Sequence, residues 1–221
     1  MQKRLLLLLL FLTACAPSPA PVDVDTTPQL LSIYIAPSAE TWIPLIYSCA
    51  DRAQIGLVSR TPDIAAADIS LRIGATRKTA YQIGEVELVI VGNAANPVEG
   101  LSQTQIEAIY AGRIHNWAEI GGEDAEINLW VYGQDDDLQL AFNKIMLESS
   151  ILSSMARQAQ TQAVMREEIA KDAYALGIIT QAQADADLRI LYSLGSFPVL
   201  AIPQEEPQGN IFSLLSCLQG R

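Results

Sequence analysis

The sequence holds one histidine, His115, and this limits the acid–base chemistry that the chain could perform. A Ser-His-Asp triad would have to use it, because histidine is the base that activates serine in such triads. There is no Gly-x-Ser-x-Gly turn, no phosphate-cradling P-loop and no Gly-x-Gly-x-x-Gly turn in the sequence. We therefore expect a protein that is not an enzyme and that uses no cofactor.

The other group with potential chemistry is the acidic run Asp135-Asp136-Asp137. Carboxylates are ligands for Mg²⁺ or Ca²⁺. Adjacent side chains diverge around a helix, however, and acids in a first turn also stabilise the helix dipole. We expect the run to serve the helix that follows it and expect no metal site. A zinc site is disfavoured as well, because the single histidine and the cysteine spacing do not match one.

The first cysteine, Cys15, ends an N-terminal segment that resembles a bacterial lipoprotein signal. Lys3 and Arg4 are followed by the apolar run 5–12, which is too short to span a bilayer. Leu12-Thr13-Ala14-Cys15 then places small residues before a cysteine, as at sites of lipidation. We expect a signal peptide over 1–15 with lipid on Cys15. An ordinary signal peptide with an incidental cysteine is the alternative.

Two cysteines remain, Cys49 and Cys217. Outside the cytoplasm, a pair of cysteines forms a disulfide more readily than it stays reduced. A Cys49–Cys217 disulfide would join the first helix to the last. The alternative is a pair of buried free thiols.

Composition indicates a globular body behind a tether. Half of the residues are hydrophobic, which is enough for a core, and the net charge is −11. A phosphate backbone is bound through Lys and Arg, so nucleic acid is a poor partner for this surface. Residues 16–28 hold four prolines without apolar periodicity, as in an extended tether. No later apolar run is long enough for a second membrane anchor.

Strand-like and helix-like segments alternate along the body. We expect strands at 30–37, 53–60, 67–75, 85–93, 127–133, 173–180, 188–194 and 197–207. We expect helices at 38–52, 102–112, 135–147, 151–170 and 210–220. Ser38 is a candidate cap for the first helix, which Pro44 places near Thr41, and Gly112 is a candidate C-cap. This alternation predicts an α/β protein with a mixed sheet covered by helices.

The chain is expected to change direction at 93–97, where it leaves one sheet and builds a second. A return near 192–198 would bring the terminal segment back to the first sheet. The expected units are lobe one, residues 29–93 with 195–221, and lobe two, residues 94–194.

The region 89–122 carries an ordered set of short motifs. An apolar strand precedes Asn96-Pro97, Leu101-Ser102, Ile109-Tyr110-Ala111-Gly112 and Asn116-Trp117-Ala118-Glu119-Ile120-Gly121-Gly122. In this order and spacing the segment resembles the type 2 periplasmic solute-binding proteins of the phosphate-binding branch. Weaker similarity at "IYIAPSAETWIPLI", "DDDLQLAFNKIML" and "AYALGIIT" extends the resemblance over about 30–220. Within it, Trp117 is expected to anchor a core and His115 to have no catalytic role.

The resemblance implies a two-lobed fold, each lobe a mixed sheet flanked by helices, that closes by a hinge over a solute. A monomer of this kind would capture a small polar or anionic solute for an ABC-type permease. It would be exported and lipid-anchored to the outer face of the cell membrane or in the periplasm. The alternative is a non-transport lipoprotein, a sensor or adaptor with lost or changed ligand binding.

The resemblance also implies where the ligand would bind. In lobe one the ligand residues would be Ser38, Ala39 and Thr41, with positive charge from Arg60 and Arg72, unless these arginines have only a surface role. In lobe two they would be Gln134, Asp135 and Asp136.

At these lobe-two positions the family has a loop rich in Ser, Gly and Thr, and this chain has carboxylates, which repel an oxyanion. Either the acids face solvent, or the ligand is not phosphate.

Overall fold

The computed structural model describes residues 30–148 and 150–220. The expected signal peptide with Cys15 and the tether at 16–28 lie outside the described residues. Within the described part, no helix combines the length and the apolar character that a membrane crossing requires.

In the part of the chain that the structure describes, eight strands and five α-helices follow one another. The strands are β1 Leu30–Ile35, β2 Leu57–Arg60, β3 Ile69–Ile73, β4 Tyr81–Asn93, β5 Asn128–Val131, β6 Arg157–Gln158, β7 Ala175–Thr180 and β8 Leu188–Pro203. The helices are α1 Ile43–Arg52, α2 Gln103–Tyr110, α3 Asp137–Phe142, α4 Gln162–Lys171 and α5 Gly209–Leu218. Short helical turns include η1 Pro37–Trp42 and η3 Trp117–Ile120, and a π-helical turn η4 Asn143–Leu147 extends α3.

The strands form a mixed sheet, in the order β2-β1-β3-β8-β4-β7-β5-β6, and this confirms the α/β class. Strands β1, β2 and β3 are parallel, as are β5, β6 and β7, whereas β8 and β4 are antiparallel to their neighbours. The expectation that the chain builds two separate sheets is wrong, because the described strands form one continuous sheet. The reason is that β4 and β8 are long enough to pair throughout, from Tyr81 opposite Ala201 to Asn93 opposite Leu188.

Strand β8 joins the two extended segments expected at 188–194 and 197–207 into one. Between them, Gly195 has a positive φ of 96°, a conformation that favours glycine. A register shift at Leu88 and Val89 of β4 lies opposite this point. The strand therefore bends here instead of ending.

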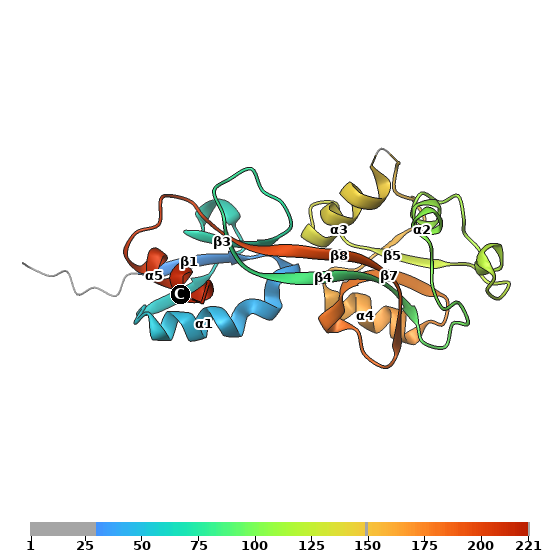
Figure 1. Ribbon diagram of the computed structural model, residues 1–221, viewed down its shortest axis with the longest axis horizontal. Helices are drawn as coiled ribbons and strands as arrows, with labels where there is room; N and C mark the ends of the chain where they lie inside the picture. Colours follow the sequence, from blue (N-terminus) through green and yellow to red (C-terminus); the bar gives the residue numbers. More distant parts are fainter. Residues whose placement is uncertain (1–29, 149, 221) are drawn as a thin grey trace, which may run out of the picture.

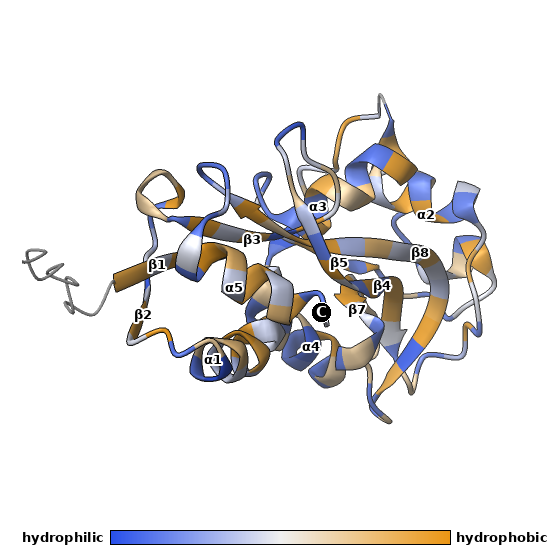
Figure 2. Ribbon diagram, turned by 60° about the vertical axis from the view of Figure 1, so that its left-hand side comes forward, coloured by the Kyte–Doolittle hydropathy of each residue, from blue (hydrophilic) through white to orange (hydrophobic). Residues whose placement is uncertain are grey.

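The elements gather at the two ends of the long β4–β8 ribbon, which runs through the middle of Figure 1. We call β1, β2, β3, α1 and α5 the α1/α5 half, and α2, β5, α3, α4 and β7 the α3/α4 half. Strands in both halves are mostly hydrophobic, as the orange colour of β1, β4 and β7 in Figure 2 shows. Ile33, Leu71, Ile90 and Ile178 are fully buried in the resulting core.

The motif-bearing segment that follows β4 is scaffolding. Ser102 caps α2 in a reciprocal capping box with Gln105, and Gly112 ends the helix with a φ of 73°. Trp117 is fully buried, and its indole Nε1 donates to the Tyr174 carbonyl oxygen at 3.0 Å. This confirms Trp117 as a core anchor. His115 is 78% exposed, and its nearest charged partner is Glu119.

The expected helix over 151–170 is wrong in its first half. Residues 157–158 form β6, which pairs with β5, and α4 begins only at Gln162. The Thr161 side chain accepts a hydrogen bond from the Val164 amide and caps α4. A polar N-cap and an edge-strand pairing therefore prevail over the helix-forming composition of this segment.

The start of the first helix also differs from expectation. Residues Pro37–Trp42 form the turn η1, and α1 begins at Ile43 with Pro44 in its first turn, where a missing N–H costs nothing. Ser38 makes no capping hydrogen bond. Its side chain is buried inside η1, so the capping role expected for Ser38 is wrong.

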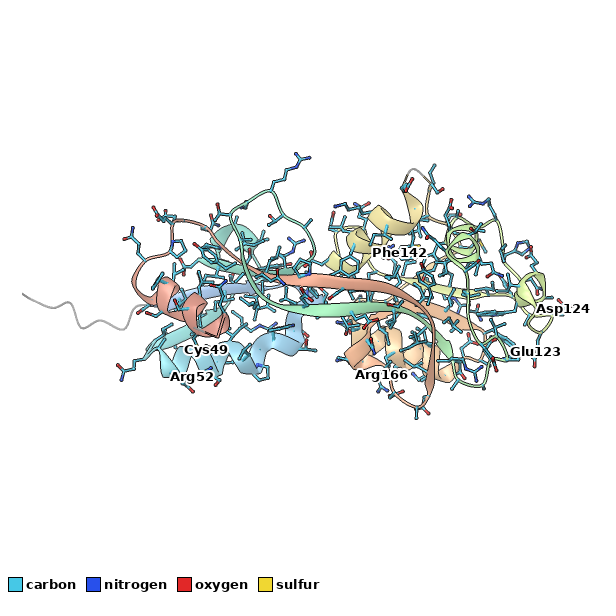
Figure 3. The ribbon with its side chains drawn as sticks, in the orientation of Figure 1. Cys49, Arg52, Glu123, Asp124, Phe142 and Arg166 are labelled. Atoms are coloured by element: carbon cyan, nitrogen blue, oxygen red, sulfur yellow. A yellow bond between two sulfur atoms is a disulfide. The ribbon has the colours of Figure 1, made fainter. Side chains whose placement is uncertain are left out.

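The disulfide between Cys49 and Cys217 is present and confirms that expectation. The two Cα atoms are 5.6 Å apart, and the bridge joins α1 to α5 across 168 residues of sequence. Cys49 projects from α1 at the end of the molecule where α5 lies (Figure 3). The bridge thus holds the last helix against the first.

We expect that replacing both Cys49 and Cys217 by Ser lowers the free energy of unfolding by about 2–5 kcal/mol, because a long loop is freed in the unfolded chain. Urea unfolding of the purified protein, with and without reductant, measures this. Reductant should shift the wild type towards the variant and leave the variant unchanged. Two free thiols in the intact mass of the unreduced protein would contradict the pairing.

We expect Gly84→Ala to destabilise the fold by about 1–3 kcal/mol, the usual cost of overpacking. A methyl group at Gly84 would lie 2.1 Å from the Cη2 atom of Trp42, whose rigid ring ends η1. Thermal unfolding measures the effect. Gly133→Ala is the matched control, because nothing lies within 4 Å of its added methyl group. Equal melting temperatures for the two variants would show that Trp42 is not held against β4.

Candidate functional site

A cavity of about 360 Å³ lies between the end of β3 in the α1/α5 half and α3 in the α3/α4 half. Its lining comes from the β3 end with the following loop, from α3 with η4, and from β8: Arg72, Ile73, Gly74, Ala75, Thr76, Asp137, Leu140, Ala141, Lys144, Ile145, Phe197, Pro198 and Ile202. Much of this wall is apolar, and Arg72, Asp137, Thr76 and Lys144 provide its polar side chains. Such a composition suits a small organic solute with a polar group.

Arg72 and Asp137 form an ion pair at this cavity. Arg72 Nε donates to Asp137 Oδ1 at 2.7 Å and to Oδ2 at 3.0 Å, and Nη2 donates to Oδ1 at 2.5 Å. The Ile73 amide donates to Oδ2 at 2.8 Å. The Asp137 side chain is 3% exposed and that of Arg72 is 28% exposed. Hydrogen bonding to Asp137, more than any other cause, raises the pKa of Arg72 above its ordinary value.

Local sequence explains why these two side chains meet. Arg72 is the fourth residue of β3, between the buried Leu71 and Ile73, and it pairs with Leu200 of β8. Asp137 is the first residue of α3, directly after its N-cap Asp136. The end of a strand in one half and the start of a helix in the other therefore bring opposite charges together.

The three acids of the run 135–137 take three different environments. Asp135 is exposed, and Asp136 Oδ1 accepts from the Leu138 amide at 2.8 Å as the N-cap of α3. Burial raises the pKa of Asp136 above its ordinary value, and the charge of Asp137 adds to the rise. Asp137 is paired with Arg72. This third carboxylate is buried and does not face solvent, and no group of metal-ligating side chains occurs among residues 30–148 and 150–220.

A second tie joins the halves at η1. Gln162, the first residue of α4, donates from Nε2 to the Ser38 carbonyl oxygen at 3.0 Å. Its Oε1 atom accepts from the amide and the hydroxyl of Thr180, at 2.9 and 2.8 Å. The Ser38 hydroxyl oxygen is itself buried and has no hydrogen-bond partner within the described residues. A buried polar atom without a partner is costly, and Ser38 is not among the residues that line the cavity at Arg72.

The remaining residues expected to bind a ligand lie elsewhere. Arg60 pairs with Glu40 at 2.9 Å, and both side chains are nearly half exposed, which matches the surface role. Gln134 and Thr41 are exposed, and Ala39 is fully buried. Of the eight ligand residues expected from the sequence, Arg72 is the one that lines the cavity.

Four residues that line the cavity or tie the two halves together are absent from the ligand residues expected from the sequence. The sequence indicates Asp137 only as a member of the acidic run 135–137, and it does not single out Lys144, Thr76 or Gln162. A signal existed for Asp137 alone, because a third acid at a helix start exceeds what one N-cap needs. The positions of the other three residues depend on which segments of the two halves come into contact, and the sequence does not show this.

Comparison with known proteins identifies the family. The model of the PBP superfamily domain matches residues 46–204. Among solved structures, a candidate phosphate ABC transporter substrate-binding protein with bound phosphate from Clostridium perfringens superposes with a TM-score of 0.74 at 19% identity, covering 86% of this chain and 93% of that one. An ABC-type phosphate transport receptor from Vibrio cholerae gives 0.67 at 18% identity, covering 86% and 94%.

The same fold also occurs in a regulatory protein. The CcmR regulatory domain from Synechocystis PCC6803, in complex with 2-PG, superposes with a TM-score of 0.58 at 12% identity, covering 86% of this chain and 96% of that one. At such identities these likenesses concern the fold. The family itself is one of binding proteins and not of enzymes. Because the domain match spans well over half of the sequence, the chain belongs to the PBP superfamily.

Proposed function

We propose that the protein captures a small polar solute between two lobes and presents it to an ABC-type permease. Lobe one is residues 29–93 with 195–221, and lobe two is residues 94–194. The observation that carries the proposal is the cavity, in which Arg72 from one half meets Asp137 from the other. A site built by both halves changes when they move apart, and this is how closure can report that a solute is bound.

The β4–β8 ribbon supports a hinge. Both strands pass between the halves (Figure 1), and β8 bends at Gly195. Few residues need to change conformation for two packed halves to rotate about such a connection. The direct ties between the halves, Arg72 with Asp137 and Gln162 with Ser38, are hydrogen bonds that can break and form again.

The charge of the cavity bears on the solute. Asp136 and Asp137 place two carboxylates near the guanidinium of Arg72, whereas Lys144 is exposed at the rim. The two carboxylates offset the positive charges of Arg72 and Lys144, so no net positive charge remains there to attract a further anion. A small polar molecule with an apolar portion fits this wall better than a multiply charged oxyanion does.

Export and lipid anchoring are part of the same proposal. They rest on the signal-like sequence that ends at Cys15, which lies outside the described residues. The Cys49–Cys217 disulfide supports export, because such bridges persist in oxidising compartments. A tether at 16–28 would let the lobes stand away from the membrane while they exchange solute with a permease.

One observation favours a second function, a non-transport sensor or adaptor on the same fold. Both ties between the halves are made by the protein itself, without any solute. A chain that holds itself closed could present one fixed surface to a protein partner. Solute binding by the purified protein decides between the two functions.

We expect a thermal-shift screen of the purified protein to find stabilising solutes among neutral amino acids and short sugars. A ligand that binds only the folded state raises the melting temperature as its concentration exceeds its dissociation constant. No shift with any solute of the screen, which also contains phosphate, sulfate and molybdate, would count against solute capture and for the adaptor.

We expect Ser38→Ala to leave thermal stability equal or higher, since a buried hydroxyl without a partner is removed. Thermal unfolding measures the effect. Ser48→Ala, at an exposed position on α1, is the matched control. A melting temperature that falls in the Ser38 variant and not in the control would show that this hydroxyl contributes to stability.

We expect Asp136→Asn to be at least as stable as the wild type at neutral pH. The raised pKa of Asp136 means that ionisation disfavours the folded state, and Asn keeps the N-cap. The difference should vanish below the ordinary carboxyl range, where Asp136 is protonated in both folded and unfolded states. Asp136→Ala, which loses the cap, should be about 1 kcal/mol less stable than Asn. Urea unfolding at several pH values measures this, and the reverse order of Asn and Ala would contradict it.

A further inference from the structure

We propose that Asp137 is a built-in anion, whose carboxylate fills the position in which Arg72 and the Ile73 amide would otherwise hold an oxyanion. The protein therefore excludes free phosphate and sulfate from this site, and its solute is uncharged or cationic. This inference rests on the proposed function, because it takes the cavity at Arg72 as the solute site.

The donors that meet Asp137 form a complete anion-binding set. The guanidinium atoms Nε and Nη2 and the backbone N–H of Ile73 converge from the end of β3, and both carboxylate oxygens accept from them. A bidentate guanidinium with an adjacent backbone amide is a strong arrangement for any oxyanion. Here all of these donors point at a side chain of the same molecule.

Burial indicates that the carboxylate occupies the inner position. Asp137 is 3% exposed, whereas Arg72 is 28% exposed and lines the cavity with it. An oxyanion that took the inner position would have to displace Asp137 from its three donors. The displaced carboxylate would then be left close to the incoming charge. A group on the same chain also competes at a high effective concentration, which no dilute solute matches.

The side chains around the Arg72–Asp137 pair add to the exclusion of anions from this site. Asp136 lies beside the pair, and its charge acts on Arg72 in the same sense as that of Asp137. Lys144 is a nearby positive group, but it is exposed at the rim of the cavity, where water screens it. The remaining wall, from residues such as Leu140, Ile145 and Phe197, offers no charge. A neutral or cationic solute can contact this wall without breaking the ion pair.

The pair also closes the protein on itself. Arg72 belongs to the α1/α5 half and Asp137 to the α3/α4 half, so the contact that an anion would make between the halves is made internally. Because a side chain takes the place of the ligand, the two halves can close without an oxyanion.

Titration with inorganic phosphate and with sulfate tests the proposal on four purified proteins. These are the wild type, Asp137→Ser, the double variant Arg72→Met with Asp137→Ser, and the matched control Asp135→Ser, which removes an exposed acid two residues away. We expect Asp137→Ser to bind phosphate at least tenfold more tightly than the wild type. The double variant should lose this gain, and the control should behave like the wild type.

Two results would overturn the inference. One is a wild type that binds phosphate as tightly as Asp137→Ser, with this binding lost in the double variant. The other is a folded Asp137→Ser that gains no affinity for phosphate. Should Asp137→Ser not fold, Asp137→Asn keeps the side-chain volume and must show the gain instead. The same measurements judge the proposed solute capture separately. If the wild type binds phosphate through Arg72, the inference about Asp137 fails but solute capture stands. If Asp137→Ser gains affinity for phosphate and the wild type binds no solute at all, the inference is supported and solute capture is contradicted.

Discussion

The ion pair between Arg72 and Asp137 is the interaction on which the arrangement of the two halves depends. It joins the end of β3 to the start of α3 at the wall of the cavity, with the carboxylate buried and hydrogen-bonded to three donors. A buried charge of this kind is stable only while its partner stays in place, because an unpaired carboxylate inside a protein is costly. The pair therefore ties the two halves together and sets the charge at this wall of the cavity.

The rest of the fold positions the two partners. The long strands β4 and β8 carry the chain between the halves, and the bend at Gly195 lies within this ribbon. The disulfide between Cys49 and Cys217 holds α5 against α1 at one end, and Trp117 anchors the loop after α2 at the other. Gln162 and Ser38 add a second tie between the two halves.

Much of the fold was predictable from the sequence, because it depends on local patterns. Apolar runs identified the strands, the motifs around Trp117 identified the family, and the count of cysteines identified the disulfide. The first part of the helix expected at 151–170 is wrong, because composition does not reveal an edge pairing such as that of β6 with β5. The role of Asp137 was not predictable, since it depends on how close the two halves come. Arg72 was identified as a positive group, but its partner lies 65 residues away along the chain.

The most direct test is the conformation of the wild-type protein without any solute. Spin labels at two exposed positions, Ser48 on α1 and Ala163 on α4, would report the distance between the halves by pulsed electron spin resonance. If Asp137 serves as the internal anion, the distance distribution of the solute-free wild type is narrow and matches the closed structure, and it broadens to longer distances in Asp137→Ser. A solute-free wild type as open as that variant would contradict the account.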